Sequence, residues 1–489
     1  MTASSQRLSG NLTTFKIVTM VVAAAAPMGA VIGIIPIAMA IGTGATTPLV
    51  FVVAAALLLC FAVGYAAMSR RMSASGGFYT YIAKGLGRST AMAAAVIAIT
   101  AYLSLTLLIL AGVGNFGNTV AAVLTGHDVP WWAFSAVALA LVAVMGVREI
   151  NIAGNVLAVM LGVEILAILV LDIAIVAQKG LDAFPLAAMN PTDLFTAGSF
   201  GLGIMFAFTT FLGFESAAIY AEESKDPHRT IPRATYSAVV LIATFYAVTT
   251  WIMVGGIGVD NVQETAEAKL SGLSFWLSAE YASDLLTKVM YVTVFTSLFA
   301  AMLALHNASS RYIFSIGREG ALLPTWFGVA HSKFDTPARA SIAVTILTSA
   351  VTVVFAVLGA DPYLTMLTIM TGLGTLGIVL LQALAAGAIM VYFWRTSRSS
   401  TGVLVGSAIG LVAFVTVSIL ILKNFQTLAG SDSAWINVLP WCLLLAAALG
   451  GLRGVWLKSH KPDAYARIGT FGDQTAPAHE ELPSTPLQK

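Results

Sequence analysis

Charged side chains are scarce in this sequence, where they make up only 10% of 489 residues; a soluble protein has about 25%. Hydrophobic residues account for 58%, and the mean hydropathy is +0.88. This composition excludes a soluble globular domain and is typical of a polytopic membrane protein. The 25 lysine and arginine residues nearly balance 23 acidic ones, which gives no indication of a nucleic-acid partner.

Cysteine and histidine are also rare. The two cysteines, Cys60 and Cys442, lie in apolar runs and indicate neither a disulfide framework nor a metal site. The six histidines are scattered, with no pair at the helical spacing of zinc ligands. The sequence contains no nucleophile–base or metal constellation, so we expect a protein that is not an enzyme and has no cofactor.

Long apolar runs dominate the rest of the sequence, and a run of about twenty residues is enough to span a membrane. They predict an all-α polytopic membrane protein with twelve transmembrane helices. The first run is longer than a signal-peptide core and has no convincing cleavage site, so we expect it to be retained. The predicted spans are centred near residues 29, 58, 105, 138, 165, 211, 247, 299, 349, 378, 413 and 446.

The basic residues are distributed very unequally between the two sides of the predicted membrane. Twelve spans place both termini on the same side, and the opposite side holds only Lys179, Lys269, Lys288 and Lys423 of the 25 lysines and arginines. The positive-inside rule assigns the basic side to the cytoplasm. We therefore expect a multi-pass protein of the cytoplasmic membrane with both termini in the cytoplasm.

A carboxylate, Glu215, lies inside the sixth apolar span. Its insertion costs roughly 2.5 to 3.5 kcal/mol, so a carboxylate at this depth usually faces a cavity, a partner or a pathway. Gly213 removes a side chain two residues earlier and loosens the helix, which predicts an interruption near 211–215. A buried glutamate that a neighbouring helix satisfies is the alternative, and we favour the functional interpretation.

The first span contains a corresponding irregularity. Pro27 removes a helix donor, and Gly29 and Gly33 permit non-helical backbone angles, which predicts a break near 27–33. The first and sixth spans run in opposite directions, so two broken helices five spans apart indicate an inverted-topology repeat with a binding site at the breaks. Glycine and proline are common in membrane helices, and the prediction depends on their corresponding positions in the two halves.

The repeat defines the expected domain organisation. Each repeat holds five spans and begins with a broken one, and two further helices follow the second repeat. The last residues are polar and contain proline, so we expect them to be disordered. The predicted segments are a cytoplasmic tail over 1–15, the first repeat over 16–178, the second over 198–394, two helices over 402–457 and a disordered tail over 458–489.

Glu164 lies near the middle of the fifth span without a cation on its own helix. An unpaired carboxyl in apolar surroundings favours its neutral form and can carry a proton. A permanently neutral side chain bonded to a neighbouring helix is an equal alternative. Tyr102 in the third span is a further candidate, although polar residues in membrane helices more often hold helices together.

Several motifs together resemble those of the amino acid-polyamine-organocation superfamily, whose members have a LeuT-type fold. The resemblance extends from about residue 16 to residue 457 and implies five plus five inverted helices followed by two more. The residues that carry it are Gly213–Ala217, Glu222, Glu223, Pro227, Arg229 and Ile231–Ala234 in and after the sixth span, Gly76–Tyr79 after the second, Arg311, Arg318–Gly320, Leu323 and Pro324 after the eighth, and Thr336, Pro337 and Ala340 before the ninth.

The resemblance implies a substrate site at the two breaks. The substrate's ammonium would lie near backbone carbonyls of the first and sixth spans, and its carboxylate near the amides that open the second half of the first span. This agrees with the partial positive charge and free N–H groups of a half-helix N-terminus. The family's aromatic gate falls near Phe208 or Thr209. The implied binding residues are Ala26, Pro27, Met28, Gly29, Ala30, Val31, Tyr102, Phe208, Thr209, Phe211 and Gly213.

Two departures from the family pattern concern substrate size and coupling. Gly29 is followed by Ala30 and Val31, where relatives often have a Gly-x-Gly before the proline. Many proton-coupled relatives have a lysine in the fifth span, where this chain has apolar residues and then Glu164. We expect Glu164 to take over the role of that lysine.

We therefore expect a secondary transporter that moves an amino acid or a related small amine across the membrane by alternating access. Its partners would be this small molecule and membrane lipid. The intramembrane carboxylates favour proton coupling through Glu215 or Glu164 over sodium coupling. The alternatives are an exchanger or polyamine carrier, in which Glu215 neutralises a second amine, and a membrane sensor that binds nutrients without transporting them.

Overall fold

A computed structural model describes residues 12–72, 76–147, 150–195, 198–396, 401–430 and 436–470. These residues form helices and their connections, with one isolated β-bridge between Leu12 and Ser224. Eleven helical segments of the described residues are long and apolar enough to cross a membrane, when each of the interrupted segments Thr14–Gly33 and Phe200–Glu223 is counted as one. The all-α fold is therefore confirmed. The fourth predicted span corresponds to α7 (Trp131–Val147), which has only 17 residues, so the total of twelve spans stays a prediction.

The described helices follow the order of the predicted spans. Those of the first predicted repeat are α1 (Thr14–Ala24), α2 (Pro27–Gly33), α3 (Ile35–Ile37), α4 (Thr47–Ser69), α5 (Phe78–Gly85), α6 (Arg88–Thr125), α7 and α8 (Ile150–Lys179). Those of the second are α9 (Phe200–Thr210), η7 (Phe214–Glu223), α10 (Pro227–Ile257), α11 (Val262–Lys269), α12 (Leu273–Tyr281), α13 (Asp284–Glu319), α14 (Ala338–Val357), η11 (Pro362–Leu367) and α15 (Thr368–Thr396). The chain continues with α16 (Thr401–Lys423), α17 (Phe425–Ala429), α18 (Leu439–His460) and α19 (Pro462–Arg467).

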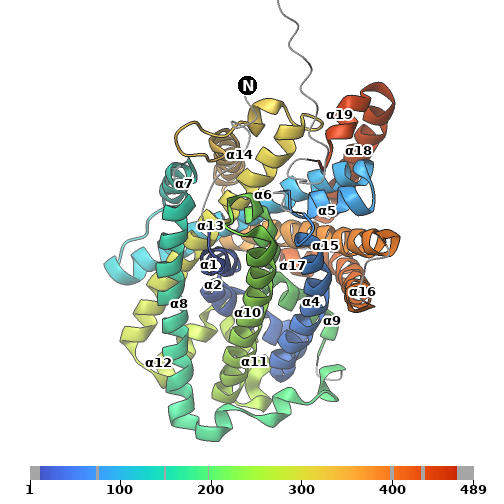
Figure 1. Cartoon of the computed structure of the whole chain (residues 1–489). Helices are drawn as coiled ribbons and strands as arrows, with labels where there is room; N and C mark the ends of the chain where they lie inside the picture. The colour runs from blue at the N-terminus through green and yellow to red at the C-terminus, as the bar shows by residue number, and fades with distance from the viewer. Residues whose placement is uncertain are drawn as a thin grey trace, which may run out of the picture.

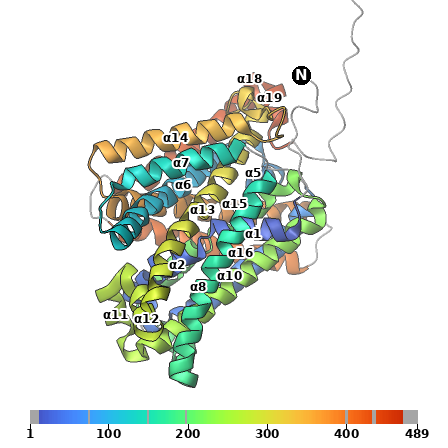
Figure 2. The ribbon, with the colours of Figure 1, turned by 90° about the vertical axis from the view of Figure 1, so that its left-hand side faces the viewer.

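The broken helices lie inside the bundle, among α4, α8, α10 and α13 (Figure 1). A second view shows α6, α7 and α14 side by side at one edge of the molecule (Figure 2). Small residues allow the close crossings of this bundle. At the crossing of α5 and α15, for example, a Cβ on Gly85 would lie 2.1 Å from the carbonyl oxygen of Ala388.

Two ion pairs join η7 to α13 at the end of the molecule that the sequence predicts to be cytoplasmic. The Arg311 guanidinium donates to both carboxylate oxygens of Glu223, at 2.5 and 2.7 Å, and both side chains are buried. Arg318 makes a corresponding bidentate contact with Glu222, at 3.0 and 2.5 Å. Paired charges are a common way to accommodate buried arginine and glutamate, and here they fix the end of η7 against α13.

The first described residue, Leu12, also contacts this end of η7. Its amide donates to the Glu223 carbonyl at 2.9 Å, and the Lys225 amide donates to the Leu12 carbonyl at 3.1 Å. The segment before α1 is thereby attached to the end of the second broken helix.

The chain after residue 458 differs from its prediction. It completes α18, forms α19 and then buries Ile468 in the hydrophobic core. The Gly469 amide donates to a carboxylate oxygen of Glu319 at 2.7 Å, and the hydroxyl of Tyr79 donates to the other oxygen. The prediction of disorder from Lys458 onward is therefore wrong for residues 458–470. This segment is ordered, and its Gly469 amide bonds the buried carboxylate of Glu319. Residues 471–489 lie outside the described part of the chain.

Candidate functional site

The first break lies between α1 and α2. Ala25 and Ala26 still donate to carbonyls of the preceding turn, and Ala26 then adopts a left-handed conformation with φ of +47°. Pro27 is the first residue of α2; its fixed φ suits this position and its missing N–H costs no helical bond there. The break thus precedes Pro27, whereas the sequence predicted it at 27–33, and Gly29 and Gly33 lie within α2.

The second break lies between α9, which ends at Thr210, and η7, which begins at Phe214. Gly213 has a φ of +113°, a conformation that residues with a Cβ rarely adopt. A Cβ at this position would lie 2.9 Å from the Cβ of Ala24, at the end of α1. The two breaks are therefore in direct contact, and glycine makes this contact possible.

The carboxylate of Glu215 bridges the second break. One oxygen accepts the Gly213 amide at 3.0 Å, and the other accepts the Tyr102 hydroxyl at 3.1 Å. The hydroxyl of Tyr65 donates to the backbone carbonyl of Glu215 at 2.6 Å. Glu215 is only 2% exposed, and its bonds satisfy a backbone amide that the break leaves without a helical acceptor.

Tyr102→Phe should destabilise the protein because it removes one of the two donors to a buried carboxylate. We expect the free energy of unfolding to fall by about 1–3 kcal/mol, the usual range for a bond to a charged or buried group. Thermal or denaturant unfolding in detergent would measure it. Tyr291→Phe is the matched control, since Tyr291 stacks on Phe275 and has no hydroxyl bond to a described residue. Equal stability of both variants would contradict the bridging role of Tyr102.

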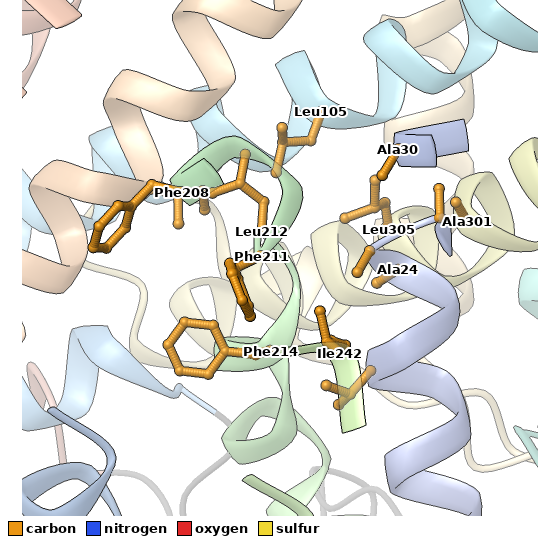
Figure 3. Packing of buried hydrophobic residues seen from close by; sticks show 14 of the residues in the cluster. Ala24, Ala30, Leu105, Phe208, Phe211, Leu212, Phe214, Ile242, Ala301 and Leu305 are labelled. Carbon is orange, nitrogen blue, oxygen red and sulfur yellow. The ribbon is translucent and has the colours of Figure 1, made fainter. Parts of the chain in front are cut away.

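A cavity of about 340 Å³ extends from the breaks toward the end of the molecule opposite the two ion pairs. Its walls come from α1, α2, α6, α9, α13, η11, α15 and α17. Figure 3 shows Ala30, Leu105, Leu212 and Leu305 around this space. The walls are mainly apolar, with hydroxyl groups contributed by Tyr363 and several threonines, among them Thr209.

The structure brings some of the predicted binding residues together at this cavity and separates others from it. Ala26, Gly29, Ala30 and Thr209 line it. The others are buried in the adjoining structure and do not line it: Pro27, Met28, Val31, Tyr102, Phe208, Phe211 and Gly213.

Phe208 and Phe211 pack away from the cavity, whereas Phe206 of α9 lines it. Phe208 points away from it in Figure 3 and packs edge-on against Phe414 of α16, with ring centroids 5.8 Å apart. Phe211 packs against Phe51 and Tyr246. Thr209 is thus the residue of the predicted gate position that contacts the cavity.

Glu164 lies on α8 at the other side of the first break. It is 1% exposed, and both carboxylate oxygens have no hydrogen-bond partner among the described residues. The hydroxyl of Ser297 on α13 and the backbone of Met28, in the first turn of α2, lie beside the carboxyl and interact with it, but neither makes a hydrogen bond of standard geometry to it. A buried carboxyl held this weakly inside a membrane bundle is a candidate for a functional role.

Sequence reasoning did not identify several residues of the cavity wall, including Leu105, Leu212, Leu298 and Leu305. Leucine in an apolar span carries no signal that distinguishes a cavity wall from a lipid-facing surface. Ala24 was missed for a different reason, because its position depends on where α1 ends.

Two interrupted helices around a central cavity, within a bundle of apolar helices, define the class of membrane transporters with a LeuT-type fold. A model of the amino acid permease family matches residues 12–449. The chain therefore belongs to the amino acid permease family of the amino acid-polyamine-organocation superfamily, and it is a transporter and not an enzyme.

Similar proteins include transporters of different substrates. An uncharacterized transporter of Mycobacterium tuberculosis is 28% identical over 330 residues, which cover 66% of this chain and 69% of the relative. The branched-chain amino acid permease of Lactococcus lactis is 24% identical over 196 residues, or 40% of each chain. The low-affinity putrescine importer of Escherichia coli is 23% identical over 304 residues, which cover 60% of this chain and 64% of the importer.

A solved structure of the Eremococcus coleocola manganese transporter resembles the chain with a TM-score of 0.54 and 12% identity. The match covers 96% of this chain and 100% of that structure. At this identity the likeness concerns the fold alone.

Proposed function

We propose that this permease is a proton-coupled secondary transporter that moves an amino acid across the cytoplasmic membrane by alternating access, with both termini in the cytoplasm. The proposal is supported chiefly by the position of Glu164, a buried carboxyl that has only weak contacts with Ser297 and Met28 beside the break between α1 and α2. An intramembrane carboxyl in this environment is suited to binding and releasing a proton.

The arrangement of the two ends supports an inward-closed conformation. The ion pairs of Arg311 and Arg318 close the predicted cytoplasmic end. The cavity extends the other way, toward Leu270 and Thr427. Opening to the cytoplasm would require η7 to separate from α13, so these contacts are the ones that alternating access breaks and remakes.

The breaks supply the groups that an amino acid's backbone requires. The amides of Met28 and Gly29 lie in the first turn of α2, where no helical carbonyl precedes them, and the helix dipole favours an anion there. Carbonyl groups at the ends of α1 and α9 would receive the ammonium group. In this pose the substrate joins the two broken helices across their contact at Gly213 and Ala24.

Protonation of Glu164 would link proton binding to substrate binding. An ionised Glu164 beside the backbone of Met28 competes for the partial positive charge at the start of α2, which the substrate's carboxylate would use at Gly29 in the cavity wall. A protonated Glu164 leaves that charge to the substrate. Proton and substrate would therefore bind together, as symport requires. Glu215 holds the second break through Gly213 and Tyr102, so in this scheme it maintains the geometry of the site.

Glu164→Gln tests this proposal in proteoliposomes, with a mixture of radiolabelled amino acids as substrate. We expect an imposed inward proton gradient to stimulate uptake by the unmodified protein. The variant should lose this stimulation and keep exchange against internal substrate, since glutamine resembles a permanently neutral glutamate. Glu264→Gln, in the exposed part of α11, is the matched control. Full stimulation of the Glu164 variant would contradict its role, and uptake that ignores the gradient in the unmodified protein would exclude symport.

A further inference from the structure

The side chains that line the cavity carry no ionisable acid or base apart from the phenol of Tyr363. Among the described residues, no aspartate, glutamate, lysine, arginine or histidine contributes to its wall. The polar side chains present are those of Tyr363 and of four threonines, which are Thr209, Thr368, Thr371 and Thr427. A charged group of the substrate that points into this space would find no opposite charge on a side chain.

The two carboxylates nearest the breaks are not available to such a group. Glu215 lies outside the cavity wall, and Gly213 and Tyr102 occupy its two oxygens. Glu164 also lies outside the wall, beside Met28 and Ser297. A second amine in the cavity would therefore lose its hydration without gaining a partner, and an uncompensated buried charge is strongly unfavourable.

Near the breaks, one part of the cavity suits the amino and carboxylate groups of an amino acid, and a neighbouring part suits its side chain. Ala25, Ala26 and Gly29 expose the backbone of the first break, because their side chains are small or absent. Beyond them, leucines of α6 and α13 enclose the space. Leu298 is in direct contact with the break, since a Cβ on Gly29 would lie 3.0 Å from its Cδ2.

From this geometry we infer that the substrate is an amino acid with an uncharged, apolar side chain. Its amino and carboxylate groups lie at the breaks, and its side chain contacts Leu105, Leu298 and Leu305. The inference rests on the proposed transport of an amino acid and narrows its substrate class. It excludes diamines and amino acids with basic or acidic side chains as preferred substrates, including the polyamine alternative in which Glu215 pairs with a second amine.

Ligand-induced thermal stabilisation of the purified full-length protein tests the inference, because a molecule that binds the folded state raises its apparent stability. The panel is leucine, valine and phenylalanine against lysine, arginine, glutamate and putrescine. We expect the apolar amino acids to reach half-maximal stabilisation at concentrations at least tenfold lower than the charged compounds. Equal or stronger stabilisation by lysine or putrescine, or stabilisation by none of the panel, would overturn the inference.

Leu298→Asp should shift the ligand preference toward basic compounds, since it places a carboxylate beside Gly29 in the cavity wall. We expect lysine and putrescine to bind this variant at least tenfold more tightly than they bind the neutral Leu298→Asn control. An unchanged preference in a folded Leu298→Asp variant would contradict the placement of the side-chain site. If the variant fails to fold, the panel with the unmodified protein decides.

Different results would disprove the proposed transport and the inferred substrate class. Apolar amino acids that stabilise the protein but show no flux in proteoliposomes would disprove transport and keep the inferred ligand class. Flux of lysine or putrescine with the same gradient dependence would keep transport and disprove the class.

Discussion

Arg311→Met is expected to lower the free energy of unfolding by about 3–5 kcal/mol, because it leaves Glu223 as a buried charge without its partner. Both side chains are almost fully enclosed, and the pair joins η7 to α13 through two short bonds. A loss of this size is a large part of the stability of an ordinary domain. Thermal unfolding of the purified protein in detergent measures it.

Two further variants determine whether the effect comes from the unpaired charge. Arg229→Ala breaks an exposed pair with Asp226, at 3.7 Å in the adjacent segment, and should change stability by less than about 1 kcal/mol. Combining Arg311→Met with Glu223→Leu removes both charges and should restore much of the stability, as replacement of buried pairs by apolar residues often does. If Arg311→Met unfolds at the temperature of Arg229→Ala, the buried pair has no special role.

Gly213→Ala is expected to reduce transport to the level of empty liposomes. The alanine would have to adopt the backbone φ of +113° found at Gly213, which costs about 1–3 kcal/mol for a residue with a Cβ. It also meets Ala24 Cβ at 2.9 Å and the Ala25 backbone nitrogen at 3.3 Å. Either the residue changes its conformation or the two breaks separate, and both outcomes disrupt the proposed backbone site. Substrate uptake into proteoliposomes is the measurement.

The control for this variant is Gly162→Ala on α8, where a Cβ would meet nothing within 4 Å. It should transport at the level of the unmodified protein. Ala24→Gly combined with Gly213→Ala removes the contact between the two methyl groups and should restore part of the activity. Normal uptake by Gly213→Ala alone would show that the contact between the breaks is not required.

The sequence located the second break better than the first for a physical reason. At Gly213 the backbone needs a positive φ, and glycine is the residue that permits it without strain, so sequence and structure agree. Proline allows two interpretations, since it ends a helix when it is internal and starts one when it is first. Pro27 starts α2, and the break therefore lies at Ala25 and Ala26, which have no unusual side chain.

The residues around Glu215 were only partly predictable. An intramembrane carboxylate is evident in a sequence, as is a tyrosine in another span, but their contact depends on how α6 rotates against η7. The direction of Phe208 likewise depends on Phe414, which belongs to α16 outside the predicted repeats. Such contacts follow from helix packing, and the order of residues within one span does not specify them.

The bridge between Leu12 and Ser224 has a consequence for how the protein is made. Leu12 and α1 are synthesised long before the backbone groups that bond Leu12, at Glu223 and Lys225, have left the ribosome. The hydrogen bonds of Leu12 can therefore form only after the end of η7 has been synthesised, and the bond of Glu319 to the Gly469 amide can form only later still. A nascent chain halted before residue 469 would contain the two broken helices but lack the amide that bonds Glu319, so this end of the molecule is completed only after that segment has been translated.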